Sequence, residues 1–284
     1  MTNDVDEIRL TLPHIELAAR LFGPVDGRPV IALHGWLDNA NSFARLAPRL
    51  EGLRILALDL AGHGASDHRP PGAGYAPWDY AHDVLQVAEK MGWPRFSLLG
   101  HSLGAIIAVM LAGSVPERVN RLVLIDGVIP PLAPAELAAE RLGMALQAQL
   151  KVANKRRTVY LDVDHAVEAR MKGAVAVSRE AAELLAQRGL TDVPGGYSWR
   201  HDLRLTLPSA ARLIEEQALS FVDHVICPAR LIVAEEGMLA QNTGLLSRLP
   251  LLMEQLPGGH HLHLNDEEGA SVVADCINRF FAEP

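Results

Sequence analysis

The sequence predicts an α/β fold, in which a mostly parallel sheet carries helices on both faces. Between residues 29 and 126, segments with strand character alternate with segments of helical spacing, which is typical of βαβ units. The same alternation returns from residue 229 to residue 283. Residues 130–225, between these stretches, have helical character and no strong strand. They therefore predict a helical insertion between two strands of one sheet.

Length and composition limit the class of protein. The 284 residues suit one α/β core with an inserted subdomain, and 49% hydrophobic residues are enough to bury a large core. The formal net charge is −8, and the densest basic run, NKRR at 154–157, is interpreted as a solvated helix end. We therefore expect no nucleic-acid partner.

Other features concern the compartment of the protein. The first ten residues are acidic and lack the apolar core of a signal peptide. There is no uninterrupted run of about 18 apolar residues, so no membrane span is expected. Cys227 and Cys276 are interpreted as two buried free thiols. These features predict a cytoplasmic protein. A homodimer is one assembly that the sequence allows.

The first elements of the chain read mainly as strands. Residues 8–12 and 15–23 are apolar or alternate in polarity, and they predict an opening β-hairpin. Residues 29–35 predict a buried strand that ends in a glycine turn. Residues 42–50 have helical spacing, with Ser42 as the expected N-cap.

The following elements complete the alternating pattern. A strand at 53–60 leads into a loop rich in Gly and Pro at 62–74, and an amphipathic helix at 78–92 ends at a glycine. Next come a strand at 95–100, an apolar helix at 103–114 and a strand at 119–126. After the insertion the α/β pattern resumes at 229–237, 251–259 and 267–283.

Residues 100–104, GHSLG, fit the pattern G-x-S-x-G between a predicted strand and a predicted helix. A nucleophile elbow requires this context, because only small flanking residues let the strand and the helix approach each other. Ser102 would then lie at a helix N-terminus, where free N–H groups favour negative charge. We interpret Ser102 as a nucleophile. The alternative is an ordinary strand-to-helix junction in which Ser102 only caps the helix.

Two other glycine turns would surround this nucleophile. The segment LHGW at 33–36 ends the preceding parallel strand and can present a backbone N–H toward the serine. We expect the N–H groups of Trp36 and Leu103 to form an oxyanion hole. His34 is expected to brace this loop through hydrogen bonds. The segment DLAGHGAS at 59–66 is interpreted as a tight turn that shapes the pocket floor.

The candidate bases lie in PGGHHLHLND at 257–266. His260 comes first after the two glycines, where the loop can swing an imidazole over the sheet edge, and we interpret it as the base. We expect His261 to turn away and His263 to be structural. No carboxylate accompanies these histidines at the spacing of a metal-binding helix, so no metal is expected. No cofactor is expected either.

These motifs together resemble the α/β-hydrolase superfamily over essentially the whole chain. LHGWLDNANSF at 33–43, DLAGHGAS, GHSLG and the glycine-histidine segment occur in the order of that family. The chain more closely resembles the serine hydrolase-like proteins of the Kraken-type branch, through LHGWLDNA, LLAQRGLT at 184–191 and RHDLRL at 200–205. The resemblance implies an eight-stranded, mostly parallel sheet with a helical cap over the active site. It divides the chain into a core, residues 1–129 and 226–284, and a cap, residues 130–225.

The acid of the implied triad departs from the family pattern. Most relatives place an aspartate after the strand that follows the cap, and that position is Gly237 here. An acid at the end of the strand after the elbow would resemble the arrangement in haloalkane dehalogenases. In this sequence that position is Asp126. A parallel neighbouring strand would bring Asp126 to the sheet edge beside His260, so we favour it. Glu235 or Glu236 is the alternative.

The resulting expectation is a serine hydrolase that cleaves small to medium carboxylic esters through an acyl-enzyme. Ser102 argues against the relatives that use an aspartate nucleophile. Thioesters and amides stay open as substrates, as do carbon–carbon bond hydrolysis and perhydrolysis, which use the same triad. A non-catalytic binding protein on this fold is the alternative of another class, and Gly237 is its only support.

The implied cap carries one polar run that could contact a substrate. Arg200, His201 and Asp202 could recognise a polar group of that substrate. We favour a salt bridge between helices as their role.

Overall fold

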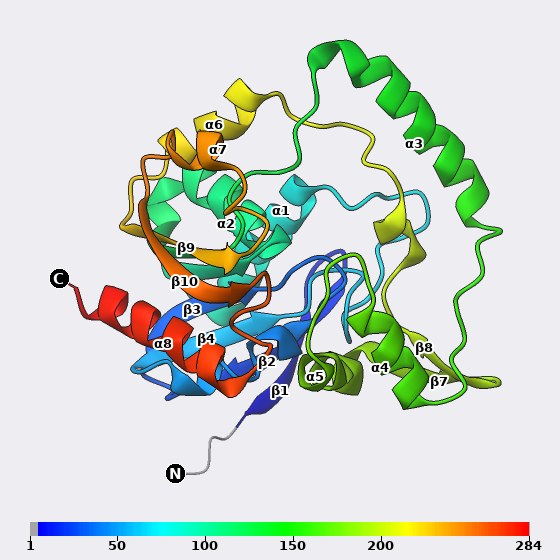
Figure 1. The fold of residues 1–284 in the computed structure, drawn as a ribbon, viewed down its shortest axis with the longest axis horizontal. Helices are drawn as coiled ribbons and strands as arrows, with labels where there is room; N and C mark the ends of the chain where they lie inside the picture. The colour runs from blue at the N-terminus through cyan, green and yellow to red at the C-terminus, as the bar shows by residue number, and fades with distance from the viewer. Residues whose placement is uncertain (1–4, 284) are drawn as a thin grey trace.

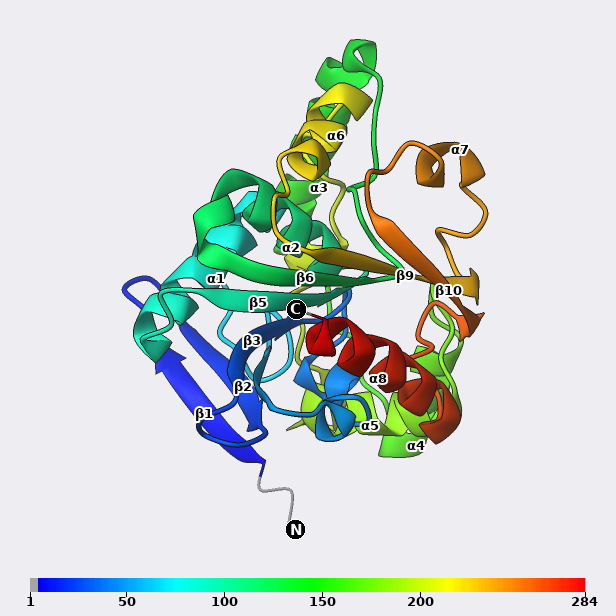
Figure 2. The same cartoon turned by 90° about the vertical axis from the view of Figure 1, so that its left-hand side faces the viewer.

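The fold is an eight-stranded sheet with helices on both faces, and the computed structural model describes residues 5–283 (Figure 1). The strand order is β1-β2-β4-β3-β5-β6-β9-β10. Figure 2 shows the sheet close to edge-on, with α1 and α2 on one side and α8 on the other. The predicted α/β architecture is therefore confirmed.

Within the eight-stranded sheet, antiparallel pairing is confined to one edge. β1 (Asp6–Thr11) and β2 (Glu16–Phe22) form the expected hairpin, and β2 also pairs antiparallel with β4 (Leu53–Leu58). The remaining pairs of the main sheet are parallel. Their strands are β3 (Arg28–Leu33), β5 (Phe96–His101), β6 (Val119–Ile125), β9 (Ala229–Glu236) and β10 (Leu252–Gly259).

The two faces of the sheet bury separate clusters. α1 (Pro77–Met91) and α2 (Leu103–Ser114) cover one face, and α8 (Glu267–Ala282) covers the other. Successive residues of β3 alternate between these faces, as the pleat of a strand requires. Ile31 belongs to the cluster with α1 and α2, whereas Val30 belongs to the cluster with α8.

The helix expected at residues 42–50 is wrong. Two short 3₁₀ turns, Ala40–Phe43 and Ala47–Arg49, replace it. Pro48 lies within the second turn and has no N–H to donate, so it interrupts a helical ladder. Asn39, not Ser42, caps the first turn.

The chain between β6 and β9, residues 126–228, is called the insertion below. It holds α3 (Ala138–Val152), α4 (Val163–Met171), α5 (Arg179–Gly189) and α6 (Glu215–Asp223). It also holds a hairpin of β7 (Leu190–Val193) and β8 (Gly196–Trp199), where no strong strand was expected. Pro194-Gly195 joins the two strands, and Gly195 has φ 92°, as a turn with Pro then Gly requires. This dipeptide was the missed signal.

Three smaller features complete the fold. A short helix, α7 (Thr243–Leu246), lies between β9 and β10. Cys276 is buried and Cys227 is partly exposed; both are free thiols, so the expectation of two buried thiols is wrong for Cys227. Within residues 5–283, none of the helices is both long and apolar enough to cross a membrane.

Candidate active site

Ser102 lies in a strained turn between β5 and α2. Its backbone has φ 51° and ψ −113°, in a region that non-glycine residues rarely adopt. The Ser102 N–H donates to the carbonyl of Ile125 over 3.0 Å, and the Ser102 carbonyl accepts from the N–H groups of Ala105 and Ile106. Such strain persists only where neighbouring structure enforces it, and it is concentrated at functional sites.

The two glycines of the GHSLG motif are required by close packing. A Cβ at Gly104 would overlap the carbonyl of Leu33 on the neighbouring strand. A Cβ at Gly100 would overlap the backbone of Ala105 in the first turn of α2. The motif therefore lets α2 start directly against the sheet, with Ser102 at its N-terminus.

His260 and Asp126 lie at the same edge of the sheet. His260 follows β10 and is 8% exposed, and its Nδ1 lies 2.6 Å from Oδ2 of Asp126. The same carboxylate accepts backbone N–H groups from Met238 at 2.9 Å and from Ala234 at 3.4 Å. Because Nδ1 donates to Asp126, Nε2 is the ring nitrogen left to accept a proton.

The alternative acids do not reach this imidazole. Glu235 and Glu236 are both exposed at the end of β9, and neither contacts His260 among the described residues. Gly237 follows them and is buried. A Cβ built on Gly237 would overlap the carboxylate of Asp126. The acid at the end of β6 therefore fills the space in which a side chain at position 237 would begin.

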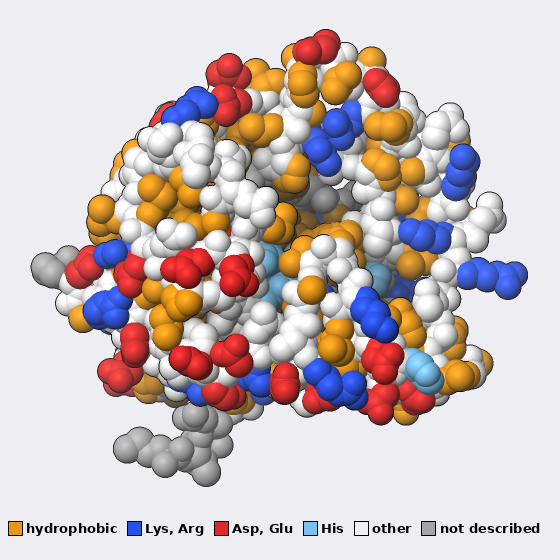
Figure 3. Space-filling model, viewed as in Figure 1, with side chains coloured by type: hydrophobic (Ala, Val, Ile, Leu, Met, Phe, Trp, Pro, Cys, Tyr) orange, Lys and Arg blue, Asp and Glu red, His pale blue; other side chains and the backbone are white. Residues whose placement is uncertain are grey.

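Ser102, His260 and Asp126 line one cavity of about 990 Å³ between the sheet edge and the insertion. Figure 3 shows a hollow in this face, with histidine side chains at its edge. Ser102 Oγ makes no hydrogen bond to any residue in 5–283, and such catalytic contacts are often loose in a free enzyme. Apolar side chains form much of the rest of the wall, among them Leu103, Ile106, Met110, Val128, Leu213 and Leu245.

Two backbone amides are candidates for an oxyanion hole. Trp36 and Leu103 both line the cavity, and neither N–H donates a hydrogen bond to another described residue. Leu37, next to Trp36, has φ 63°, so the loop after β3 is also strained. The Trp36 side chain points to the insertion instead, where its Nε1–H donates to the carbonyl of Leu205 over 2.9 Å.

His34 has the bracing contacts expected of it. Its Nδ1 donates to the carbonyl of Gly35 over 2.7 Å, and its Nε2 accepts the N–H of Leu60 over 3.0 Å. Burial lowers the pKa of His34, because it disfavours the charged imidazolium. A neutral His34 therefore links the loop after β3 to the chain after β4.

His101 is a site residue that the sequence reasoning missed. It occupies the first variable position of the GHSLG motif and is fully buried. Its Nε2 donates to the carbonyl of His260 over 2.9 Å, so it fixes the backbone that carries the candidate base. Burial, followed by the imidazoles of His263 and His261, holds the pKa of His101 well below its usual value. This residue is therefore a neutral support of the His260 loop.

The expectation that His261 turns away is wrong. His261 is buried, lines the cavity and places Nε2 3.1 Å from Oδ2 of Asp38. The other oxygen of Asp38 accepts from Arg170 of α4 over 2.8 Å. Burial acts to raise the pKa of Asp38, but His261 and Arg170 outweigh it and hold that pKa well below its usual value. His263 is structural, as expected, with Nε2 3.0 Å from Ser42 Oγ.

The same cluster bears on metal binding. Donor atoms of Asp38, His101 and His261 lie within 4.8 Å of one another. The sequence argument that no carboxylate accompanies these histidines therefore fails in three dimensions. Arg170 already supplies a cation to Asp38 at 2.8 Å, however, so the donor set does not fit a metal well.

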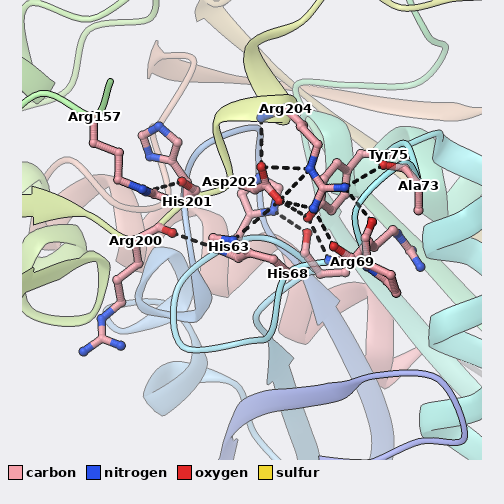
Figure 4. A network of polar contacts seen from close by, with 12 residues as sticks. His63, His68, Arg69, Ala73, Tyr75, Arg157, Arg200, His201, Asp202 and Arg204 are labelled. Atoms are coloured by element: carbon pink, nitrogen blue, oxygen red, sulfur yellow. Dashed lines mark hydrogen bonds and ion pairs between the residues drawn. The ribbon is translucent and has the colours of Figure 1, made fainter. Parts of the chain in front are cut away.

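Arg200, His201 and Asp202 do not form the expected salt bridge between helices. Asp202 pairs with Arg204, two residues later, at 2.6 Å and accepts the Tyr75 hydroxyl at 2.7 Å (Figure 4). Burial acts to raise the pKa of Asp202, but its bonds from Arg204 lower it to about 2. This network joins the insertion to the loop at 69–75.

Asp59 provides a second tie between the core and the insertion. Its fully buried carboxylate accepts the N–H groups of Ala40 at 2.7 Å and Ala65 at 2.8 Å, and it pairs with Arg188 of α5 at 2.7 Å. Asp59 begins the DLAGHGAS turn, and its position in that turn is the signal that could have identified it.

Comparisons of sequence relate this chain to known hydrolases. The family model described as alpha/beta hydrolase fold matches residues 28–156. A serine hydrolase-like protein of Danio rerio is 33% identical, over 98% of this chain and 90% of that protein. Serine hydrolase-like protein 2 of Homo sapiens is 32% identical, over 97% of this chain and 94% of that protein.

Comparisons of structure agree. The crystal structure of a hypothetical protein from Pseudomonas aeruginosa PAO1 is similar with a TM-score of 0.96 and 62% identity, and the match covers 98% of this chain and 100% of that one. The thioesterase domain from the curacin biosynthetic pathway is similar with a TM-score of 0.83 at 22% identity, over 99% of this chain and 100% of that one. At that identity the similarity supports the fold alone.

Proposed function

Because this chain belongs to the serine hydrolase-like proteins of the α/β-hydrolase family, we propose that it hydrolyses carboxylic esters of small to medium acyl length. In this proposal Ser102 is the nucleophile, His260 the base and Asp126 the acid. One observation carries it: a serine held in a strained turn and a histidine 2.6 Å from a buried aspartate line the same cavity.

The proposed reaction has two steps. In the first, Ser102 Oγ attacks the carbonyl carbon while Nε2 of His260 takes the hydroxyl proton. The bond to the alcohol oxygen then breaks, that oxygen takes the proton, and the acyl-enzyme remains. In the second, His260 takes a proton from water, the hydroxide attacks the acyl carbon, and Ser102 leaves with the proton as the acid is released.

Asp126 and two amides stabilise the charges in this scheme. Asp126 holds Nδ1–H and offsets the positive charge of the imidazolium in each step. The free N–H groups of Trp36 and Leu103 would donate to the oxygen that becomes negative in the tetrahedral intermediate. Residues 130–225 would act as a cap, because segments within that range line the cavity opposite the sheet edge.

The non-catalytic alternative loses its one sequence argument in this reading. Gly237 leaves the usual acid position without a side chain, but the Asp126 carboxylate occupies that space. The same three side chains could also hydrolyse thioesters, amides or carbon–carbon bonds, or catalyse perhydrolysis. No contact in the cavity favours one of them over ester hydrolysis.

Labelling by a fluorophosphonate tests the proposal. The wild-type protein should be labelled and should hydrolyse p-nitrophenyl esters over a range of acyl lengths. Ser102→Ala should lose both, with a rate loss on the order of 10⁶ by analogy with a serine protease. Ser209→Ala is the matched control, because Ser209 also lines the cavity, and it should keep both. A Ser102→Ala variant within tenfold of the wild-type rate would overturn the proposal.

A further inference from the structure

Three arginines line the cavity, and two of them are neutralised. Arg170 pairs with Asp38 at 2.8 Å, and Arg204 pairs with Asp202 at 2.6 Å. Both aspartates are buried. These two guanidinium groups are therefore structural and offer no net charge to a ligand.

The third, Arg212, is different. It lies on the segment before α6 and makes no hydrogen bond or ion pair with any residue in 5–283. The pKa of Arg212 lies below its usual value because of partial burial and because a second guanidinium, that of Arg141, is nearby. No acidic side chain contributes an opposing effect.

Arg141 of α3 supplies the second guanidinium group, next to the residues of that helix that line the cavity. It lies in the first turn of α3, four residues before Ala145, and residues four apart share one face of a helix. Ala145 is buried and lines the cavity, so Arg141 lies on the cavity face of α3. Its Nε is buried without a hydrogen-bond partner, and Arg141 forms no ion pair within the described chain.

A backbone hydrogen bond joins the two segments that lead to the helices near these arginines. The N–H of Ala133, in the segment before α3, donates to the carbonyl of Leu213, next to Arg212, over 3.2 Å. The segments that lead into α3 and α6 therefore lie side by side. In Figure 3, Lys and Arg side chains gather at the upper rim of the hollow, between α3 and α6. Two like charges without an acid beside them repel each other, and an anion between them would remove that repulsion.

We infer that Arg141 and Arg212 bind an anionic group of the substrate, a carboxylate or a phosphate, at the end remote from the reacting carbonyl. Guanidinium groups suit both anions because they donate two parallel N–H bonds. The apolar wall between Ser102 and Arg212 would hold the intervening chain. The substrate class depends on the proposed function, whereas the anion site itself does not.

Kinetics on matched esters tests the substrate class. The probes are p-nitrophenyl half-esters of glutarate, adipate and suberate, each paired with a neutral p-nitrophenyl ester of equal chain length. We expect kcat/KM to favour at least one half-ester over its neutral match. Arg141→Gln with Arg212→Gln should lower kcat/KM for that half-ester at least tenfold, which is about 1.4 kcal/mol, and change the neutral match less than twofold.

The control variant is Arg156→Gln. Arg156 is an exposed arginine of the insertion that does not line the cavity, so its loss removes one positive charge from the same region without altering the cavity wall. It should leave both esters unchanged within twofold. Equal effects of the double variant on charged and neutral esters would overturn the inference, and so would an equal loss in Arg156→Gln.

Binding to the Ser102→Ala protein tests the anion site without any reaction. Calorimetry would compare heptanoate and hexyl phosphate with hexanol as the neutral probe. We expect at least one anion to bind at least tenfold more tightly than hexanol, and its charged group identifies the natural anion. This preference should disappear in Ser102→Ala carrying Arg141→Gln and Arg212→Gln.

The two proposals fail in different ways. Anion binding in a protein that hydrolyses no ester would sink the proposed reaction and leave the anion site standing. Ester hydrolysis without any preference for an anionic probe would sink the anion site alone.

Discussion

The carboxylate of Asp126 occupies the space into which a side chain at Gly237 would extend. The two residues follow neighbouring parallel strands, β6 and β9, whose carboxyl ends meet at one edge of the sheet. A carboxylate can therefore reach Nδ1 of His260 from β6, while position 237 has to stay empty.

The first prediction concerns the acid. Asp126→Asn should reduce kcat by about 10³ to 10⁴, because an asparagine amide no longer stabilises the imidazolium or fixes its tautomer. Glu235→Gln and Glu236→Gln should each change kcat less than about tenfold, since both side chains are exposed and lie off the imidazole. Steady-state assays on one p-nitrophenyl ester would compare the three. A larger loss in either glutamine variant would show that the acid of the triad is that glutamate at the end of β9.

The second prediction exchanges the two positions. Gly237→Asp alone should lower the unfolding midpoint, because its Cβ would overlap the Asp126 carboxylate. Asp126→Gly should cost little backbone strain, because Asp126 has φ 41°, which glycine adopts readily. The double variant should be more stable than Gly237→Asp and more active than Asp126→Gly, as expected for neighbouring positions that couple. Strictly additive effects on stability and activity would contradict the shared space.

The third prediction tests the packing of the nucleophile turn. Gly104→Ala should destabilise the protein by about 3 kcal/mol or more, because the added methyl overlaps the Leu33 carbonyl and the sheet cannot yield. Gly143→Ala is the matched control, since Gly143 lies in α3 and an added Cβ would meet nothing within 4 Å beyond the adjacent backbone of its own helix. That change should stabilise by about 0.5 to 1 kcal/mol through helix propensity. Urea unfolding measures both, and a mild effect at position 104 would refute the close approach.

The fourth prediction concerns acid stability. Five histidines have a folded-state pKa below the usual value, and burial is the largest cause in each. The pKa is about 4 for His201 and about 3 for His263. The other three are His34, His63 and His101. As pH falls below about 6.5, these residues take up protons only in the unfolded chain, so stability decreases. More than about one unit above that pH they contribute almost no dependence.

Urea midpoints at pH 7.5, 6.5 and 5.5 measure this effect. The midpoint should fall modestly between the first two and much more steeply between the second and the third. His263→Gln should reduce the slope in the acid range by roughly one proton, because each such histidine contributes about 1.4 kcal/mol per pH unit. An unchanged slope in that variant would mean that His263 is protonated in the folded protein.

The parts of this site that the sequence predicts are those whose residues lie close together in the chain or at the ends of neighbouring strands. GHSLG puts the proposed nucleophile, its backbone strain and one candidate oxyanion amide within five residues, so Ser102 and Leu103 could be singled out by pattern. Asp126 could be placed beside His260 because parallel strands end at a common edge. The fold class followed in the same way from alternating segments.

The parts that could not be predicted depend on long-range contacts. His261 was expected to turn away, but it meets Asp38, 223 positions earlier, and Arg170 from the insertion. Which of several adjacent histidines turns inward is decided by those partners, and no local pattern encodes them. The 3₁₀ turns at 40–49, in contrast, did have a local signal in the sequence. Pro48 indicates a break in a helix, but the prediction gave more weight to the helical spacing of the apolar residues.

α3 is only weakly attached to the rest of the molecule, although it forms part of the cavity wall. Ala145 is its one buried residue among fifteen, and Leu142 and Leu150 stay 44% and 74% exposed. A helix with so little buried surface opens at a small fraction of the global unfolding free energy, so its amides should exchange with deuterium long before those of β5. Bound ligand that spans from Ser102 to Arg141 would slow this exchange. If the exchange shows this, the wall would adjust to bound chains of different length, and the cost of ordering α3 would set how tightly each one is held.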